Sequence, residues 1–219
     1  MKSADEVRRD FDRIARASAA GADALGPHEG SLLDLVTPCE SALDAGCGSG
    51  AVARRLAARC RRVDAVDLSP EMIRVARERS AARPNVEFHV GDVRDWLRDA
   101  ARYDCITSMA VLHHMDAREV VPLLVRALRP GGLLLLVDIL TRRGLLHLPL
   151  NAAGWVASHF KHGSSELRRA WREHGRGEIY LTIAEARALF GELLPGAEVR
   201  GHLVWRYSVV WRKPVSAPA

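Results

Sequence analysis

The stretch Leu43-Asp44-Ala45-Gly46-Cys47-Gly48-Ser49-Gly50 decides the fold of this chain. Apolar residues before it predict a short strand over 42–45, and the periodicity after it predicts a helix over 51–60. Glycines between a strand and a helix let a ligand approach the backbone without a side-chain clash, and the helix N-terminus behind them offers free N–H groups. The stretch therefore predicts a ligand-binding turn at the carboxyl end of a strand in an α/β sheet.

Strands and helices alternate beyond this turn. The expected strands are 62–68, 86–90, 103–109 and 133–140, and the expected helices are 70–82 and 116–128, with 129–132 as a turn into the fifth strand. A helix over 183–194 precedes strands over 198–203 and 205–212, whose link is too short for a parallel crossover. We therefore predict an α/β fold: a doubly wound, Rossmann-like sheet of seven strands, mostly parallel with an antiparallel last strand, and helices on both faces.

The length of 219 residues predicts a single domain. Residues 1–40 are expected to hold N-terminal helices over 3–20, where Ser3 and Glu6 have the spacing of a capping box, and over 28–36. Residues 141–180 interrupt the alternation. We expect this insertion to act as a lid or substrate-binding segment, with a helix over 164–174 and Trp171 as an apolar anchor. An amphipathic helix packed on the body of the protein is the alternative.

The net charge of +5 is confined to one segment. Residues 141–176 hold seven Lys or Arg against two Asp or Glu, so a nucleic-acid footprint and a local cationic lid both stay open. The balanced composition argues against disorder, and no apolar run is long enough for a membrane span. The N-terminus does not read as a secretory signal, so we expect a cytoplasmic protein.

The cysteines and histidines show no metal-binding spacing. Cys39, Cys47, Cys60 and Cys105 contain no CxxC pair and are expected to be free thiols. No metal is expected.

Three acidic residues end three successive strands. Asp44 precedes the glycines, where it is unfavourable for an anionic pyrophosphate but suits an ammonium group, such as the methionine part of S-adenosylmethionine. Asp67 can accept hydrogen bonds from ribose hydroxyls, and Asp92 from an adenine amino group. Because the glycine spacing also fits the dinucleotide fingerprint, a nicotinamide-dependent oxidoreductase stays open, although Asp44 and Asp92 disfavour it.

With these residues the chain resembles the class I S-adenosylmethionine-dependent methyltransferases, in the type 11/25-like small-molecule branch related to quinone-biosynthesis methyltransferases. The resemblance covers roughly residues 41–140, with no family motif in 141–180. It rests on Asp44-x-Gly46-x-Gly48-x-Gly50, on Asp67 and Asp92, on Tyr103-Asp104-Cys105-Ile106-Thr107-Ser108 and on Leu128-Arg129-Pro130-Gly131-Gly132.

The resemblance implies S-adenosylmethionine as cofactor and S-adenosylhomocysteine as product. The glycine turn would hold the methionine part, Asp67 the ribose, and Met72 and Asp92 the adenine, while the end of the fourth strand would lie near the sulfonium. The cofactor-binding residues so implied are Asp44, Ala45, Gly46, Cys47, Gly48, Gly50, Asp67, Leu68, Met72, Asp92, Val93, Ser108 and Met109.

The histidine pair after the fourth strand supplies the candidate catalytic residues. His113, with His114 second, could act as a base if the acceptor carries a proton. Asp138 ends the fifth strand, where it would orient an amine or pair with an arginine.

The expected reaction is in-line transfer of a methyl group to an O, N or C nucleophile of a small, biosynthetic acceptor. Alternatives are an RNA methyltransferase, for which nucleic acid would be the partner, and a non-methylating S-adenosylmethionine-binding protein. Nucleic acid is not the expected partner, and a homodimer stays open.

Overall fold

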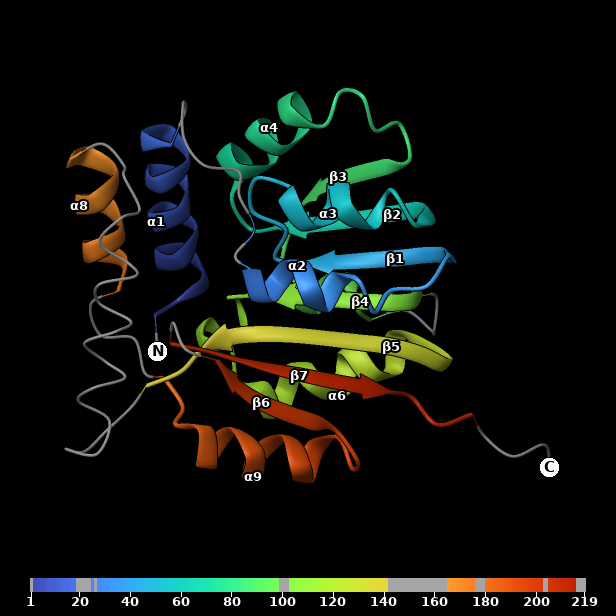
Figure 1. Cartoon of the computed structure of the whole chain (residues 1–219). Coiled ribbons are helices and arrows are strands. Elements are labelled where there is room, and N and C mark those ends of the chain that lie inside the picture. Colours follow the sequence, from blue (N-terminus) through green and yellow to red (C-terminus); the bar gives the residue numbers. More distant parts are fainter. Residues whose placement is uncertain are drawn as a thin grey trace.

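Within the residues that the computed structural model describes, seven strands form one sheet in the order β3-β2-β1-β4-β5-β7-β6 (Figure 1). These residues are 2–18, 25, 27–98, 103–141, 165–175, 180–202 and 205–215. β7 is antiparallel to both its neighbours, β5 and β6, whereas the pairs from β3 to β5 are parallel. The predicted seven-stranded, mostly parallel sheet is confirmed. The strands are β1 Cys39–Ala45, β2 Cys60–Asp67, β3 Val86–Val90, β4 Tyr103–Met109, β5 Leu128–Ile139, β6 Glu198–His202 and β7 Arg206–Arg212.

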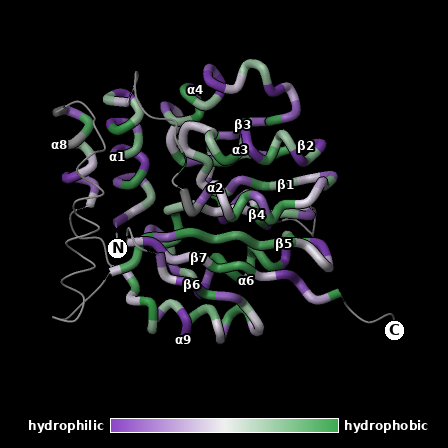
Figure 2. The backbone as a smooth tube through the Cα atoms, viewed as in Figure 1, coloured by the Kyte–Doolittle hydropathy of each residue, from purple (hydrophilic) through white to green (hydrophobic). Residues whose placement is uncertain are grey.

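Helices cover both faces of the sheet. One apolar cluster joins one face to α2 (Pro27–Leu33), α3 (Ala51–Leu56) and α4 (Pro70–Arg79). A second cluster joins the other face to α5 (Val93–Trp96), α6 (Ala117–Ala127) and α9 (Ile183–Leu193). Figure 2 shows the hydrophobic colour running along β5, whose residues from Leu133 to Val137 are all buried. A strand buried on both faces explains why its sequence is apolar without alternation.

The predicted boundaries differ from the structure at the ends of several helices and strands. The helix expected over 51–60 ends at Leu56, and the one expected over 70–82 ends at Arg79. The turn expected at 129–132 belongs to β5, because Gly131 donates to the carbonyl of Lys213 at 2.8 Å and Lys213 donates back to Gly132 at 2.9 Å. Helix α5 and the 3₁₀ turn η1 (Leu112–His114) were not predicted, since each is only about one turn long.

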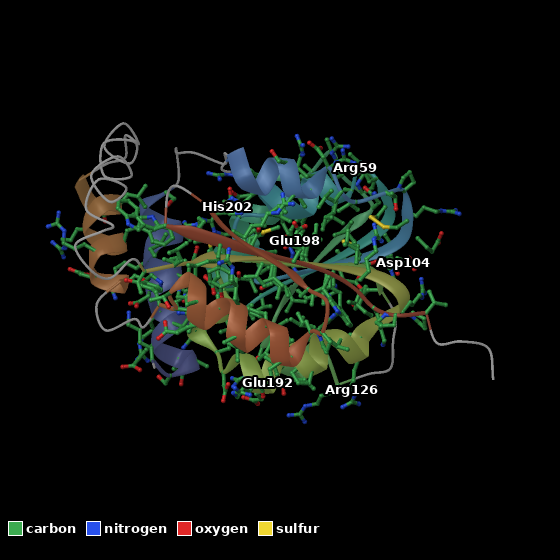
Figure 3. All side chains as sticks on the ribbon, turned by 60° about the horizontal axis from the view of Figure 1, so that its bottom comes forward. Arg59, Asp104, Arg126, Glu192, Glu198 and His202 are labelled. Atoms are coloured by element: carbon green, nitrogen blue, oxygen red, sulfur yellow. A yellow bond between two sulfur atoms is a disulfide. The ribbon has the colours of Figure 1, made fainter. Side chains whose placement is uncertain are left out.

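The expectation of four free thiols is wrong for two of them. Cys39 and Cys60 begin β1 and β2, are paired directly in the parallel register with Cα atoms 4.5 Å apart, and form a disulfide. Figure 3 shows this bond in yellow, near the labelled Asp104. Asp104 accepts from the backbone N–H groups of Glu40 and Ser41, so both features lie at the amino end of β1. Strand register, which spacing along the chain does not reveal, brings the two sulfur atoms together.

Two helices stand side by side at the edge toward which the arrowheads of β1 and β5 point (Figure 1). They are α1 (Ala4–Ala17), with the predicted capping box between Ser3 and Glu6, and α8 (Ser165–His174). Ile14, Ala15 and Ala170 pack together with Met72 of α4. A 2.5 Å ion pair between Arg13 and Glu173 adds to this contact. Segments far apart in sequence thus form one cover over the carboxyl edge of the sheet.

Much of the predicted lid lies outside the described residues, namely 142–164 and 176–179. Among the described residues, no helix has the length and apolar character needed to cross a lipid bilayer.

Candidate active site

A cavity of about 700 Å³ lies between the carboxyl edge of the sheet and the cover formed by α1 and α8. Its walls come from the glycine turn after β1, the ends of β2, β3 and β4, and the turn η1. Such a volume falls in the range that small-molecule sites occupy. The cavity lies where open α/β sheets bind ligands.

The glycine turn adopts a backbone shape that other residues rarely adopt. Gly46, Gly48 and Gly50 have φ angles of +78°, +50° and +83°. A Cβ atom on Gly46 would lie 2.3 Å from a methyl group of Val111, so the turn packs directly against the segment that follows β4. The N–H groups of Gly46 and Cys47 both donate to the carbonyl of Val66, at 2.8 and 3.0 Å. The turn is therefore held between β2 and η1.

Asp44 is a buried carboxylate, and one of its two oxygens accepts no hydrogen bond. Its Oδ1 accepts a hydrogen bond from Thr107 at 2.9 Å, while its Oδ2 is buried and has no hydrogen-bond partner. Burial, helped by the nearby charge of Asp67, raises the pKa of Asp44 to about 7 despite the bond from Thr107. Asp44 lines the cavity, so an ammonium group bound there would pair with this oxygen.

Asp67 holds the glycine turn and the start of α4 together. Its Oδ2 accepts from the N–H of Gly48 at 2.8 Å, and its Oδ1 accepts from the N–H of Ser69 at 2.9 Å. Burial raises the pKa of Asp67. Each carboxylate oxygen has a further lone pair, so two ribose hydroxyls could still donate to it.

Asp92 is already engaged with Arg94. It caps α5 by accepting from the N–H of Arg94 at 2.8 Å, and the guanidinium of Arg94 contacts both carboxylate oxygens. Burial raises the pKa of Asp92, but these hydrogen bonds outweigh burial and hold the pKa below its usual range. An adenine amino group would share this carboxylate with Arg94.

Most of the predicted cofactor-binding residues border the cavity. Those that do are Asp44, Gly46, Cys47, Gly48, Asp67, Leu68, Met72, Asp92, Val93 and Met109. Ala45, Gly50 and Ser108 do not border it. Ala45 and Ser108 are the strand neighbours of Asp44 and Met109, which do border the cavity, and adjacent residues on a strand point to opposite faces. Gly50 is the N-cap of α3, where a Cβ atom would meet the ring of Phe88.

The side chain of His113 is paired with the carboxylate of Asp138 at the end of β5. The Nδ1 atom of His113 lies 2.5 Å from Oδ1 of Asp138, and the backbone N–H of His113 donates to Oδ2 at 2.7 Å. Both side chains are almost fully buried, and His113 borders the cavity. The arginine partner considered for Asp138 is not what the structure shows.

His114 and His174 complete a cluster of three histidines with His113. One ring nitrogen from each lies within 4.8 Å of the other two. Burial, followed by the charges of His113 and His174, lowers the pKa of His114 to about 3. The spacing of these residues along the chain does not reveal the cluster, because His174 arrives on α8.

Three residues that border the cavity were not singled out by the sequence analysis. Phe11 and Lys2 from the N-terminal segment, together with Tyr180, border the cavity. The apolar face of the first helix signals that Phe11 is buried, but nothing in that pattern says against what. Val111, which meets Gly46, was likewise not singled out.

Two requirements of S-adenosylmethionine are met by these residues. The unpartnered Oδ2 of Asp44 suits the cofactor's ammonium group, and the glycine turn leaves its backbone open to the cavity. The residues present therefore fit this cofactor.

The comparisons with known proteins agree with the geometry. Residues 42–132 match the family model described as a methyltransferase domain. An uncharacterised methyltransferase of Mycobacterium tuberculosis is 36% identical over 197 residues, which is 86% of this chain and 95% of that protein. The malonyl-[acyl-carrier protein] O-methyltransferase of Serratia marcescens is 41% identical over 99 residues, 45% of this chain and 38% of that protein.

A solved structure shares the fold. The DhpI–SAH complex superposes with a TM-score of 0.65 at 23% identity, covering 95% of this chain and 97% of that one. The mycobacterial relative matches 86% of this chain, residues 42–132 match the family model, and the site fits the cofactor. The chain therefore belongs to the class I S-adenosylmethionine-dependent methyltransferases.

Proposed function

We propose that this enzyme methylates a small-molecule acceptor, on an O, N or C nucleophile, by in-line displacement. The observation that carries the proposal is the unpartnered oxygen of Asp44 at the wall of a covered cavity, beside the open glycine turn. S-adenosylmethionine, when bound, supplies an already activated methyl group, so the protein mainly has to align the reactants.

The site residues divide the work of binding and alignment. Asp44 would bind the cofactor's ammonium group, the backbone of the glycine turn would lie along its methionine part, and Asp67 would bind the ribose. Met72, Asp92 and the backbone of Val93 would contact the adenine. His113 and His114 follow Val111 and border the cavity, where they would face the acceptor.

The covered shape of the cavity favours a small acceptor. The cofactor and the acceptor would share about 700 Å³ beneath α1 and α8, which leaves little room for a folded macromolecule to present its target atom. We further propose that α8 is the described part of a lid and that the protein works in the cytoplasm. The proposed function requires no membrane-spanning segment.

Calorimetry and a labelled-methyl screen test the proposal. The protein should bind S-adenosylmethionine and S-adenosylhomocysteine, and not NAD. Asp67→Ala should weaken binding by about 1.5–3 kcal/mol, tenfold or more, because hydrogen bonds to a charged group are lost. Mass spectrometry of metabolite extracts incubated with labelled cofactor should find a small product that has gained one methyl group.

Two outcomes would contradict it. NAD binding without S-adenosylmethionine binding would overturn the cofactor assignment. Tight cofactor binding with no methylated small molecule in any extract would instead favour the non-methylating or RNA-directed alternative.

A further inference from the structure

We infer that His113, held by Asp138, is the general base of this enzyme, and that the acceptor is a hydroxyl compound about as acidic as a phenol. The inference deepens the proposed function and rests on it. It names both the residue that receives the proton and the class of acceptor.

The first step is the geometry of the pair. Asp138 accepts three hydrogen bonds: from the backbone N–H of His113 at 2.7 Å, from that of Ile139 at 2.7 Å, and from the ring of His113 at 2.5 Å. A carboxylate can only accept, so the proton on the neutral ring lies on Nδ1. The lone pair for taking another proton is then on Nε2, and the ring cannot turn without losing its bond to Asp138.

The second step is the position of His113 relative to the cofactor cradle. Val111, two residues before His113, touches Gly46 of the glycine turn. Between β4 and η1, Ala110 has a φ of +59°, which a residue with a side chain adopts at some cost. Its N–H bonds to the carbonyl of Val137 at 2.7 Å, which fixes this strained turn. The backbone thus directs His113 to the cavity next to the expected methyl group.

The third step compares the neighbouring groups that could also take a proton. His114, from the same turn, is kept neutral by burial, and a group with a pKa of about 3 is a weak base at neutral pH. His174 of α8 bonds to Asp10 of α1 at 3.3 Å, and Lys2 also pairs with Asp10. Tyr207 of β7, opposite Asp138, has a pKa raised by burial and by the charge of Asp138. Only His113 combines an aligned carboxylate with a place on the cavity wall near Val111 among the described residues.

The fourth step follows from proton chemistry. As the acceptor oxygen bonds to the methyl carbon, the carbon–sulfur bond breaks with its electron pair going to sulfur, and the O–H proton passes to Nε2 of His113. The resulting imidazolium is paired with the Asp138 carboxylate until it releases the proton to solvent. A phenol, with a pKa of about 10, is within reach of an imidazole base, whereas an alkyl alcohol is far less acidic. A carboxylate acceptor has no proton to lose and would gain nothing from this pair.

The aromatic surroundings agree with a planar acceptor. The ring of His113 lies 5.3 Å from that of Tyr180, and Phe11 contacts His114 and His174 edge to face at 5.7 and 4.8 Å. All of these side chains border the cavity. An aromatic ring can pack against such walls while its hydroxyl faces His113.

The first test uses 4-nitrophenol, whose absorbance differs between phenol and phenolate. S-adenosylhomocysteine has a neutral sulfur, so saturating the wild-type enzyme with it avoids the sulfonium charge that would itself stabilise phenolate. At a pH where free 4-nitrophenol is protonated, the enzyme should increase phenolate absorbance in proportion to bound ligand. The His113→Gln variant should lose this signal while binding S-adenosylhomocysteine within about threefold of wild type. If the wild-type enzyme produces no phenolate signal, the inference is wrong.

The second test follows methyl transfer to the acceptor found by the labelled screen. His113→Gln should lower kcat by about 10²–10⁴-fold, the usual contribution of a general base. Asp138→Asn, the positioning variant, should lower kcat with little change in the KM for the acceptor. His89→Gln on β3, outside the cavity, should keep wild-type rates.

The product separates failure of this inference from failure of the proposed function. An aryl methyl ether whose formation depends on His113 supports both. A methyl ester, or full turnover by His113→Gln, leaves the proposed function intact and overturns the base and the acceptor class. Loss of S-adenosylhomocysteine binding in the wild-type protein would instead defeat the proposed function itself.

Discussion

At the scale of one residue, the buried carboxylate of Asp44 leaves an oxygen available for binding but lowers the stability of the free protein. A carboxylate with a raised pKa binds a proton more tightly in the folded than in the unfolded chain. The free energy of unfolding therefore falls as the pH rises from about 4 to about 7, and the full penalty is present above that range. Under the proposed function, the cofactor's ammonium group would remove this penalty, so the buried oxygen that weakens the free protein would strengthen the complex.

This predicts a pH dependence for S-adenosylhomocysteine binding. Below the pKa of about 7 the ligand's ammonium group must displace a proton from Asp44, so affinity should fall about tenfold for each pH unit below 7 and level off above it. Asp44→Asn should weaken binding at pH 8 and abolish the slope, as measured by calorimetry from about pH 5.5 to pH 8. The ligand-free variant should be more stable than wild type at pH 8 by a few kcal/mol.

A matched variant controls for the loss of any carboxylate. Asp104→Asn removes an acid at the opposite edge of the sheet, where it pairs with Arg129, and should leave the pH slope of binding unchanged. A flat wild-type affinity over the same range would show that Asp44 is not the group that meets the ammonium.

At the scale of elements, the glycine turn and η1 act as one packed unit. Gly46→Ala should destabilise the protein by about 2–4 kcal/mol, because the new Cβ would overlap Val111 and the φ of +78° disfavours any side chain. Urea denaturation measures the effect. Gly191→Ala in α9 is the control: nothing lies within 4 Å of its Cβ position, so it should stabilise the helix by up to about 1 kcal/mol. Equal stabilities for the two variants would mean that the turn repacks freely.

The contact between α1 and α8 gives a second prediction at this scale. Ala170→Glu places a charge among Ile14, Ala15 and Met72, and should loosen the cover. Hydrogen exchange should then quicken in the amides of α8, and acceptor turnover should fall more than S-adenosylhomocysteine affinity. Arg169→Ala changes an exposed neighbour and should do neither. Slow exchange and full turnover in the Ala170→Glu variant would show that α8 is not part of a working lid.

The elements that carry strong local signals could be predicted from the sequence, and the others could not. The limits of β3 and β4 were predicted as observed, and β3 is bounded by the turn residues Asn85 and Gly91. The continuation of β5 through Pro130 and Gly131 depends on pairing with Lys213 beyond β7, which no local pattern encodes. The same holds for the pairing of Cys39 with Cys60 and of His113 with Asp138. Acids at strand ends were found because topology brings all such ends to one edge. The packing of α1 against α8 was not predicted, because tertiary contacts set it.

At the scale of the whole molecule, the charge distribution bears on the partner. The basic excess lies in residues 141–176, much of which falls outside the described residues. RNA binding by such a segment would weaken steeply with salt, because each neutralised phosphate releases counterions. We predict no tight binding of structured RNA at physiological salt, measured by fluorescence anisotropy across a salt series. Nanomolar binding with a steep salt dependence would favour the RNA alternative.

The contact between Gly46 and Val111 also bears on the order in which the two substrates enter. Under the proposed function, the cofactor would bind the glycine turn and the acceptor would lie beside the turn that carries His113. Because the two turns pack together at Gly46 and Val111, binding of either ligand would restrict the other turn. Any factor by which the acceptor tightens S-adenosylhomocysteine must equal the factor by which S-adenosylhomocysteine tightens the acceptor. The enzyme would then bind its acceptor most tightly after the cofactor has bound. By the same coupling, release of either product would weaken the binding of the other.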